Sequence, residues 1–278
     1  MWDWEVKTKQ PWFRLGIRDL FHYKDLILRF TKRDLLASYQ QTLIGPLWVV
    51  MQPLLTTLMY VLVFSRVAKI STDDIPPLLF YLPGVILWNY FSECLTGTMN
   101  TFQHNAYIFN KVYFPRLAVP ISQVLTSTFR MAIQLAIFVV IYVIYIYILH
   151  YELTINSSIL LLPICLLLCA GFAMGSGLIV SVLTAKYRDL DTLLQFVLRL
   201  FMFATPVVYP SSMIAEDYQW LFWLNPLTPA IETLRYAFFG SPAISWETFI
   251  TSVFSVCILM LVGLVVFKRN EIRVMDTV

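Results

Sequence analysis

The chain has 278 residues, of which 59% are hydrophobic and only 13% are charged. Soluble domains carry about 25% charged residues, so this composition excludes an ordinary soluble enzyme, a disordered chain and a small secreted disulfide scaffold. The formal net charge is +3, which gives no sign of a nucleic-acid partner. We therefore expect a membrane protein.

Six segments of the chain are apolar enough to cross a membrane as helices. A spanning helix needs about 20 mostly apolar residues, because the hydrocarbon core is about 30 Å thick. In the fourth segment Gly171, Gly175 and Gly177 permit close helix packing. Residues 35–278 are therefore predicted to form one all-α integral membrane domain, which follows a cytoplasmic segment over 1–34. The six predicted spans are residues 35–65, 78–102, 121–150, 158–184, 192–209 and 248–267.

The basic residues fall mainly on one side of this layout. If the N-terminus is cytoplasmic, fifteen Lys and Arg residues lie on the cytoplasmic side and three, Arg66, Lys69 and Arg235, lie on the other. Cytoplasmic loops carry an excess of Lys and Arg. Both termini are therefore predicted to be cytoplasmic.

Residues 12–33 have the pattern of an amphipathic helix. Basic and polar residues recur every three or four positions on one face, opposite an apolar stripe. A basic amphipathic helix lies in the headgroup layer of a membrane. Two interpretations stay open, which are an anchor for the first span and a role in meeting an anionic lipid-linked substrate.

The segment 104–120 is too polar to cross the membrane and too apolar for a solvated loop. Tyr107, Ile108 and Lys111 are spaced to share one face of a helix, which Pro115 would end. We expect a short helix along the cytoplasmic face, with exposed aromatic side chains that suit a groove in a partner protein. A connector that only lies on the surface is the alternative.

Three charged residues lie within the predicted spans, namely Glu93, Arg130 and Arg199. A charge in lipid is costly, so each should face a partner or a wet cavity. We expect Glu93 to pair with one of the arginines. A direct contact with substrate is the alternative.

Residues 216–240, between predicted spans five and six, are predicted to form an external segment, because the apolar run within it, residues 218–230, is too short to cross the membrane. Pro226 and Pro229 interrupt its apolar run, which is typical of a re-entrant or interfacial segment. Its aromatic residues would form a hydrophobic external gate that dewets, or would only anchor the loop at the outer interface. The residues concerned are Trp220, Phe222 and Trp223.

The motifs of nucleotide binding and covalent catalysis are absent from the sequence. There is no G-x-x-x-x-G-K-[ST] loop, and the four cysteines form no C-x-x-C pattern. We therefore expect a protein without enzyme activity, without a metal site and without a cofactor of its own.

Six short motifs follow one another along the chain. They are RDL at 33–35, LIGPLW at 43–48 with Pro53, NKVYFPR at 110–116, YRD at 187–189, TPVVYP at 205–210 and NPL at 225–227. In this order and layout they resemble the membrane subunit of bacterial ABC-2-type exporters, in particular the permeases that export O-antigen, capsule or teichoic-acid polymers.

The resemblance implies a half-transporter in the bacterial inner membrane. Two copies of the chain would form a conduit for a lipid-linked polysaccharide, and a separate ABC ATPase subunit carrying ATP and Mg would dock beneath each copy. The helix over 104–114 would be the coupling helix, and its contact residues would be Tyr107, Ile108, Asn110, Lys111, Tyr113 and Phe114.

The resemblance also suggests where the substrate would bind. Arg14, Arg18 and Arg33 would contact the lipid diphosphate. Aromatic faces stack loosely on sugar rings, so the conduit would be lined by aromatic residues of the first two spans, although such residues also concentrate at membrane interfaces. A drug or small-lipid exporter of the same architecture is the alternative, and a membrane-embedded lipid-linked glycosyltransferase is less favoured. The conduit candidates are Trp48, Trp88, Tyr90 and Phe91.

Overall fold

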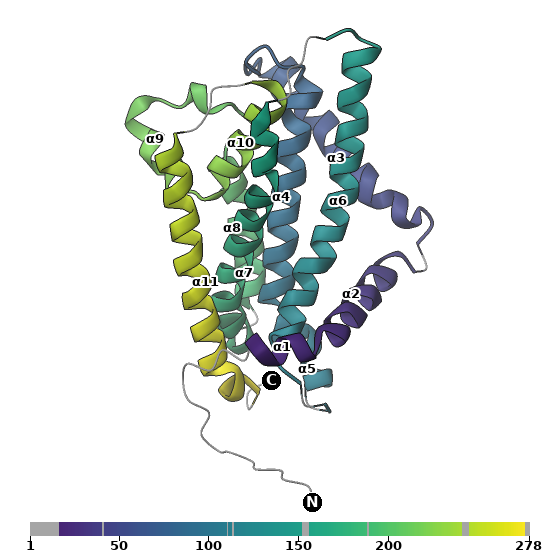
Figure 1. Ribbon diagram of the computed structural model, residues 1–278, viewed down its shortest axis with the longest axis vertical. Helices are drawn as coiled ribbons and strands as arrows, with labels where there is room; N and C mark the ends of the chain where they lie inside the picture. The colour runs from purple at the N-terminus through teal and green to yellow at the C-terminus, as the bar shows by residue number, and fades with distance from the viewer. Residues whose placement is uncertain are drawn as a thin grey trace, which may run out of the picture.

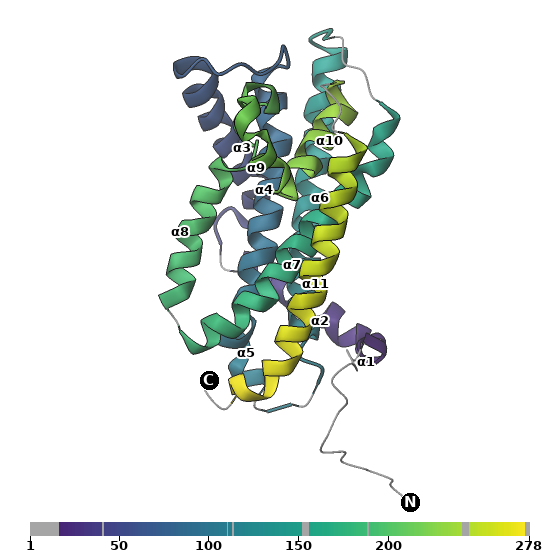
Figure 2. The ribbon, with the colours of Figure 1, turned by 90° about the vertical axis from the view of Figure 1, so that its left-hand side faces the viewer.

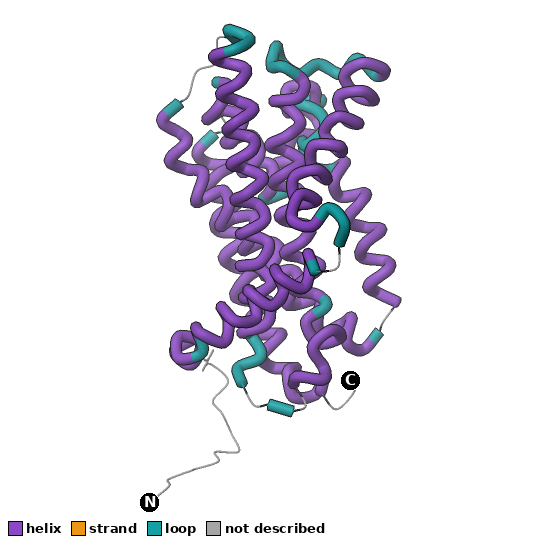
Figure 3. Tube along the Cα trace, turned by 90° about the vertical axis from the view of Figure 1, so that its right-hand side faces the viewer, coloured by secondary structure: helices purple, strands orange, loops and turns teal. Residues whose placement is uncertain are grey.

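The computed structural model describes most of the chain as helices. The described residues are 17–40, 42–109, 111–112, 114–151, 156–187, 189–240 and 245–275. Every regular element in these ranges is helical, which confirms the predicted all-α class (Figure 3). Arg14, Asn110 and Tyr113 lie outside the described residues, and only the backbone is described at Arg18.

Five helical segments of the described chain are long and apolar enough to span a membrane. They correspond to predicted spans one to four and six, and they are Gly45–Val67, Pro77–Met99, Ala118–Tyr147, Ser157–Lys186 and Trp246–Glu271. The segment predicted as span five differs, because α8 (Asp189–Phe203) has only 15 residues. At about 1.5 Å per residue, this helix is about 22 Å long and falls short of the hydrocarbon core.

The first span also begins later than the sequence suggested. The helix α2 (Lys24–Tyr39) follows the short helix α1 (Ile17–His22) and continues past Leu35. The chain then turns at Gly45, whose φ of +58° is a left-handed conformation that glycine adopts without a steric penalty. The first candidate span therefore starts at Gly45, with α3 at Trp48–Tyr60 and a π-helical segment at Val61–Val67.

The helix α4 (Pro77–Met99) forms the centre of the bundle (Figure 1). It is apolar on all sides and buried along most of its length, packed against α6 (Ala118–Tyr147) and α7 (Leu162–Lys186). The long helix α11 (Trp246–Met275) packs along α7. In contrast, α3 and α8 lie at the edges and expose many large apolar side chains (Figure 2).

The two ends of the bundle carry different short helices. At one end, which we call the α5 end, lie α1, α5 (Thr101–Phe109) and the C-terminal turns of α11 (Figure 1). At the opposite end, which we call the α10 end, lie α9 (Glu216–Trp223) and α10 (Leu227–Phe239).

The backbones of α7 and α11 touch where glycines face each other. A Cβ atom added to Gly263 would lie 2.4 Å from the carbonyl oxygen of Gly175. A Cβ atom on Gly177 would lie 2.7 Å from the side chain of Thr98 on α4. The glycines of α7 therefore allow the close helix packing that their spacing predicts.

Candidate functional site

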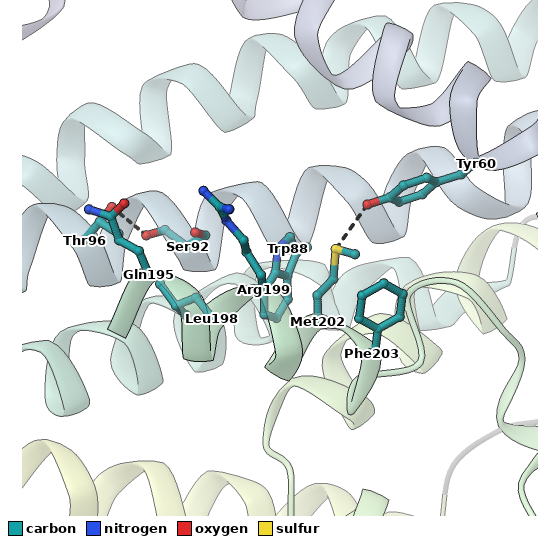
Figure 4. A pocket seen from close by; sticks show the side chains of 9 residues that line it. All are labelled: Tyr60, Trp88, Ser92, Thr96, Gln195, Leu198, Arg199, Met202 and Phe203. Atoms are coloured by element: carbon teal, nitrogen blue, oxygen red, sulfur yellow. Dashed lines mark hydrogen bonds between the residues drawn. The ribbon is translucent and has the colours of Figure 1, made fainter. Parts of the chain in front are cut away.

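A groove of about 380 Å³ opens between α3, α4 and α8 (Figure 4). Its polar end, toward the α5 end, contains Ser92, Thr96 and Gln195. Its other end is aromatic and apolar. The side chains there are Tyr60, Trp88, Met202 and Phe203, while Leu198 and Arg199 lie between the two ends.

The helical repeat explains why these residues share one groove. On α4, Trp88, Ser92 and Thr96 are four residues apart, and Gln195 and Arg199 have the same spacing on α8. Residues four apart lie on the same face of a helix. Two such faces, one from each helix, therefore form opposite walls of the groove.

The four residues predicted to line the conduit lie in different parts of the structure. Only Trp88 lines the groove. The Tyr90 hydroxyl lies 2.9 Å from the Thr128 hydroxyl on α6, and Phe91 is buried within the bundle. Trp48 is exposed at the start of α3.

Of the nine groove residues the sequence predicted roles only for Trp88 and Arg199, and the residues it missed include the aromatic Tyr60 and Phe203. The Tyr60 hydroxyl lies 3.2 Å from the Met202 sulfur and so connects α3 with α8 across the groove. Both residues lie in apolar runs rich in aromatic side chains. That they line a groove follows only from knowing that α8 is the neighbour of α3 and α4.

The charged residues of the predicted spans separate into a pair and a single residue. Arg130 lies 3.3 Å from the Glu93 carboxylate, which confirms the expected pairing of Glu93 with an arginine. Arg130 also donates to the Ser38 hydroxyl at 2.6 Å and so links α6 to α2 and α4. Within the described residues Arg199 makes no hydrogen bond or ion pair, and its side chain enters the groove (Figure 4).

The segment predicted to couple to an ATPase is only partly helical, because α5 ends at Phe109. Tyr107 is 70% exposed, and the ammonium group of Lys111 lies over its ring and donates to its hydroxyl. Ile108 is half-buried, whereas Phe114 is buried. In the described residues, the exposed part of this segment is therefore centred on Tyr107 and Lys111.

An aromatic cluster fixes α5 to its neighbours. The ring of Phe114 lies 5.6 Å from that of Phe30 on α2 and 5.6 Å from that of Phe109. Phe102 stacks on Phe267 of α11 at 5.0 Å. A displacement of α5 would therefore be transmitted to α2 and α11 through packed rings.

Arg33, one of the three predicted diphosphate contacts, lies on α2 toward the α5 end. Its guanidinium is 2.7 Å from the Asp34 carboxylate and lies over the Phe30 ring. The Asp34 carboxylate also accepts a hydrogen bond of 2.8 Å from Gln123 on α6. This network holds α2 against the bundle while Arg33 stays partly exposed.

The predicted gate residues lie on α9, a helix of eight residues at the α10 end. Trp220 and Trp223 are exposed, whereas the Phe222 ring contacts the Tyr209 ring at 5.9 Å. The segment is thus held through Phe222, and its two tryptophans project from the surface of the single chain.

The helix α10 contains a buried ion pair that sequence analysis missed. The sequence places Arg235 among the basic residues on the side of the membrane opposite the termini, but in the structure its side chain is only 1% exposed. Its guanidinium lies 3.2 Å from the Glu232 carboxylate, donates to the Val207 carbonyl at 2.9 Å and lies 3.8 Å from the centre of the Phe80 ring. The signal in the sequence was a glutamate three residues before an arginine within an apolar run.

Both ends of α10 have hydrogen-bond partners that allow its burial. The Asn225 side chain accepts from the Leu227 amide at 3.0 Å and donates to the Thr205 hydroxyl at 2.8 Å. At the other end, the Asn156 side chain donates to the Tyr236 carbonyl at 3.0 Å, and the Tyr142 hydroxyl donates to the Phe238 carbonyl at 2.7 Å. Irregular backbone is tolerated at membrane depth only when it is satisfied by protein or water in this way.

Comparison with known proteins gives the family. The O-antigen export system permease protein RfbA of Klebsiella pneumoniae is 28% identical over 250 residues, which are 90% of this chain and 93% of that protein. The polysialic acid transport protein KpsM of Escherichia coli is 24% identical over 211 residues, which are 74% of this chain and 78% of that protein. The capsule polysaccharide export inner-membrane protein CtrC of Neisseria meningitidis is 21% identical over 261 residues, or 91% and 94% of the two chains. Residues 25–239 match the family of ABC-2 type transporters, and the chain therefore belongs to this family, as its motifs predicted.

Proposed function

We propose that this chain is the permease half of an ATP-driven transporter that exports a lipid-linked polysaccharide across the bacterial inner membrane. One observation carries the proposal. Relatives named for O-antigen, polysialic acid and capsule polysaccharide export each align with at least 74% of this chain. The aromatic groove supports it, because Tyr60 and Phe203 offer ring faces on which sugar rings can stack, beside the mostly buried ring of Trp88.

In this proposal the α5 end is cytoplasmic, and both termini lie on that side. The positive-inside rule supports this orientation, because Lys111, Arg116 and Lys186 all lie at the α5 end. Arg33 lies on α2 toward the same end, and together with Arg14 and Arg18 it would meet the diphosphate of the lipid carrier.

The helix α5 would receive the force of ATP hydrolysis from a separate ABC ATPase subunit. The exposure of Tyr107 supports a contact with a groove in that subunit. Only Asn100 separates the end of α4 from the start of α5. A tilt of α5 would therefore act directly on α4, which forms one wall of the groove.

Two copies of the chain would enclose the conduit. The exposed apolar faces of α3 and α8 support this arrangement, because the groove lies between these two edge helices and α4. At the α10 end, Trp220, Phe222 and Trp223 would seal the exit of the resting transporter. Each copy would bind one ATPase subunit.

The experiment that tests the function is deletion of this gene in its host, with complementation by the parent gene. The deletion strain is expected to lose one polysaccharide from the cell surface and to accumulate it on its lipid carrier inside the cell. Surface staining and extraction of lipid-linked polymer measure the two pools. A deletion strain with parental amounts of every surface polysaccharide would contradict the proposal.

A further inference from the structure

The position of Arg199 in the groove has an electrostatic consequence. Arg199 lies ten residues after the start of α8 at Asp189, which is about 15 Å along the helix. An arginine at such a depth is costly unless an anion or water faces it.

Two acidic residues of the helices around the groove have other partners, and a third, Asp189, lies ten residues from Arg199 at the start of α8. Glu93 of α4 pairs with Arg130. Asp191 of α8 accepts hydrogen bonds from Gln195 at 3.1 Å and from Asn100 at 3.2 Å. Arg199 therefore lacks a counter-ion within the described residues, and its guanidinium is left for an anion that enters the groove.

The groove around Arg199 suits a molecule with a charged head and an apolar or carbohydrate part. Next to Arg199 lies Ser92 (Figure 4), whose hydroxyl makes no hydrogen bond within the described chain and can donate to an anion. Beyond it, Tyr60 and Phe203 form an aromatic surface, and the mostly buried Trp88 ring lies beside them. Guanidinium groups bind phosphate oxygens through two parallel hydrogen bonds, so a phosphate ester matches this arrangement by charge and shape.

We propose that Arg199 binds the diphosphate of the lipid-linked polysaccharide inside the groove, in the C-terminal half of α8. This inference rests on the proposed function, and it adds a second anion site deeper in the membrane than the cations of the N-terminal segment. The site would hold the diphosphate while the charged head of the lipid crosses the apolar core. Ser92 would donate a further hydrogen bond, and the aromatic surface would contact the first sugars.

The test is equilibrium binding of a radiolabelled polyprenyl diphosphate to the full chain, purified with its ATPase partner in nanodiscs. Arg199→Met is expected to weaken binding about 10- to 100-fold, because hydrogen bonds between charged groups are lost. Arg199→Lys keeps the charge but cannot form two parallel hydrogen bonds, so its affinity should lie between those of the parent and Arg199→Met. Arg66→Met removes an exposed arginine outside the groove and should bind as the parent does.

Three results would overturn the inference. One is parental affinity of Arg199→Met for the diphosphate. Another is equal binding of the same polyprenol without phosphate, or full competition by phosphatidylglycerol, which would indicate a general lipid site. The third is dissociation of two copies of the chain in Arg199→Met without loss of diphosphate affinity, which would assign Arg199 to an ion pair between copies. Failure of the proposed function would appear separately, as unchanged surface polysaccharide in the deletion strain.

Discussion

Replacing Arg235 by methionine should destabilise the α10 end of the protein. Methionine has a similar length but no charge, so it leaves the Glu232 carboxylate buried without its partner. Arg235 is 1% exposed and Glu232 is 4% exposed, so water cannot compensate. Removing one member of a buried ion pair costs about 3–5 kcal/mol. We expect Arg235→Met to lower the free energy of unfolding by about this amount.

The same structure predicts how two further variants behave. Adding Glu232→Gln to Arg235→Met removes the unpaired buried charge, so the double variant should be more stable than Arg235→Met alone. Phe80→Leu keeps the ion pair and a buried apolar side chain, but it removes the ring contact with Tyr81 at 5.2 Å and the contact with the guanidinium, which lies 3.8 Å from the ring centre. A contact of this kind contributes about 0.5–2 kcal/mol, so Phe80→Leu should have the smaller effect.

The assay is unfolding of the purified chain in mixed micelles with increasing dodecyl sulfate, followed by tryptophan fluorescence. The matched control is Arg66→Met, because Arg66 is exposed and surface substitutions usually change stability by less than about 0.5 kcal/mol. The reasoning is refuted if Arg235→Met unfolds like this control, or if the double variant is less stable than Arg235→Met.

Three further predictions concern other parts of the chain. Tyr107→Asp with Ile108→Asp should release or uncouple the ATPase, because carboxylates at exposed Tyr107 and half-buried Ile108 disrupt the contact surface of α5; export at the parental rate would contradict this. Trp220→Ala with Trp223→Ala should raise ion leak through the resting transporter in vesicles, and an unchanged leak in assembled protein would leave only an anchor. Gly263→Ala should cost about 1–3 kcal/mol in the unfolding assay, because its Cβ would lie 2.4 Å from the Gly175 carbonyl oxygen; parental stability would contradict it.

The lengths of the apolar runs predicted most of the fold but not all helix ends. Five predicted spans correspond to helices long enough to cross a membrane within the described chain. The first predicted span begins at Leu35, because no charged residue follows until Arg66, whereas in the structure the turn at Gly45 sets the boundary. The fifth predicted span extends to Tyr209, whereas α8 ends at Phe203, three residues before Pro206, which cannot continue a helix.

The site was harder to predict because residue type does not show which way a side chain faces. Trp88, Tyr90 and Phe91 are neighbours in the sequence, but only Trp88 lines the groove. What each of these side chains faces can be assigned only when the helices that neighbour α4 are known. Arg235 was misplaced for a related reason, because an arginine in a short apolar segment looks exposed until its partner Glu232 and the fold of α10 are seen.

The glycine contact between α7 and α11 determines which parts of the bundle can move. Where two backbones touch, no flexible side chain lies between them to absorb sliding or rotation, so the two helices behave as one stiff body. The edge helices α3 and α8 instead present large side chains that can change rotamer. We therefore expect α7 and α11 to keep their relative position during a transport cycle, while the edge helices α3 and α8 move against them.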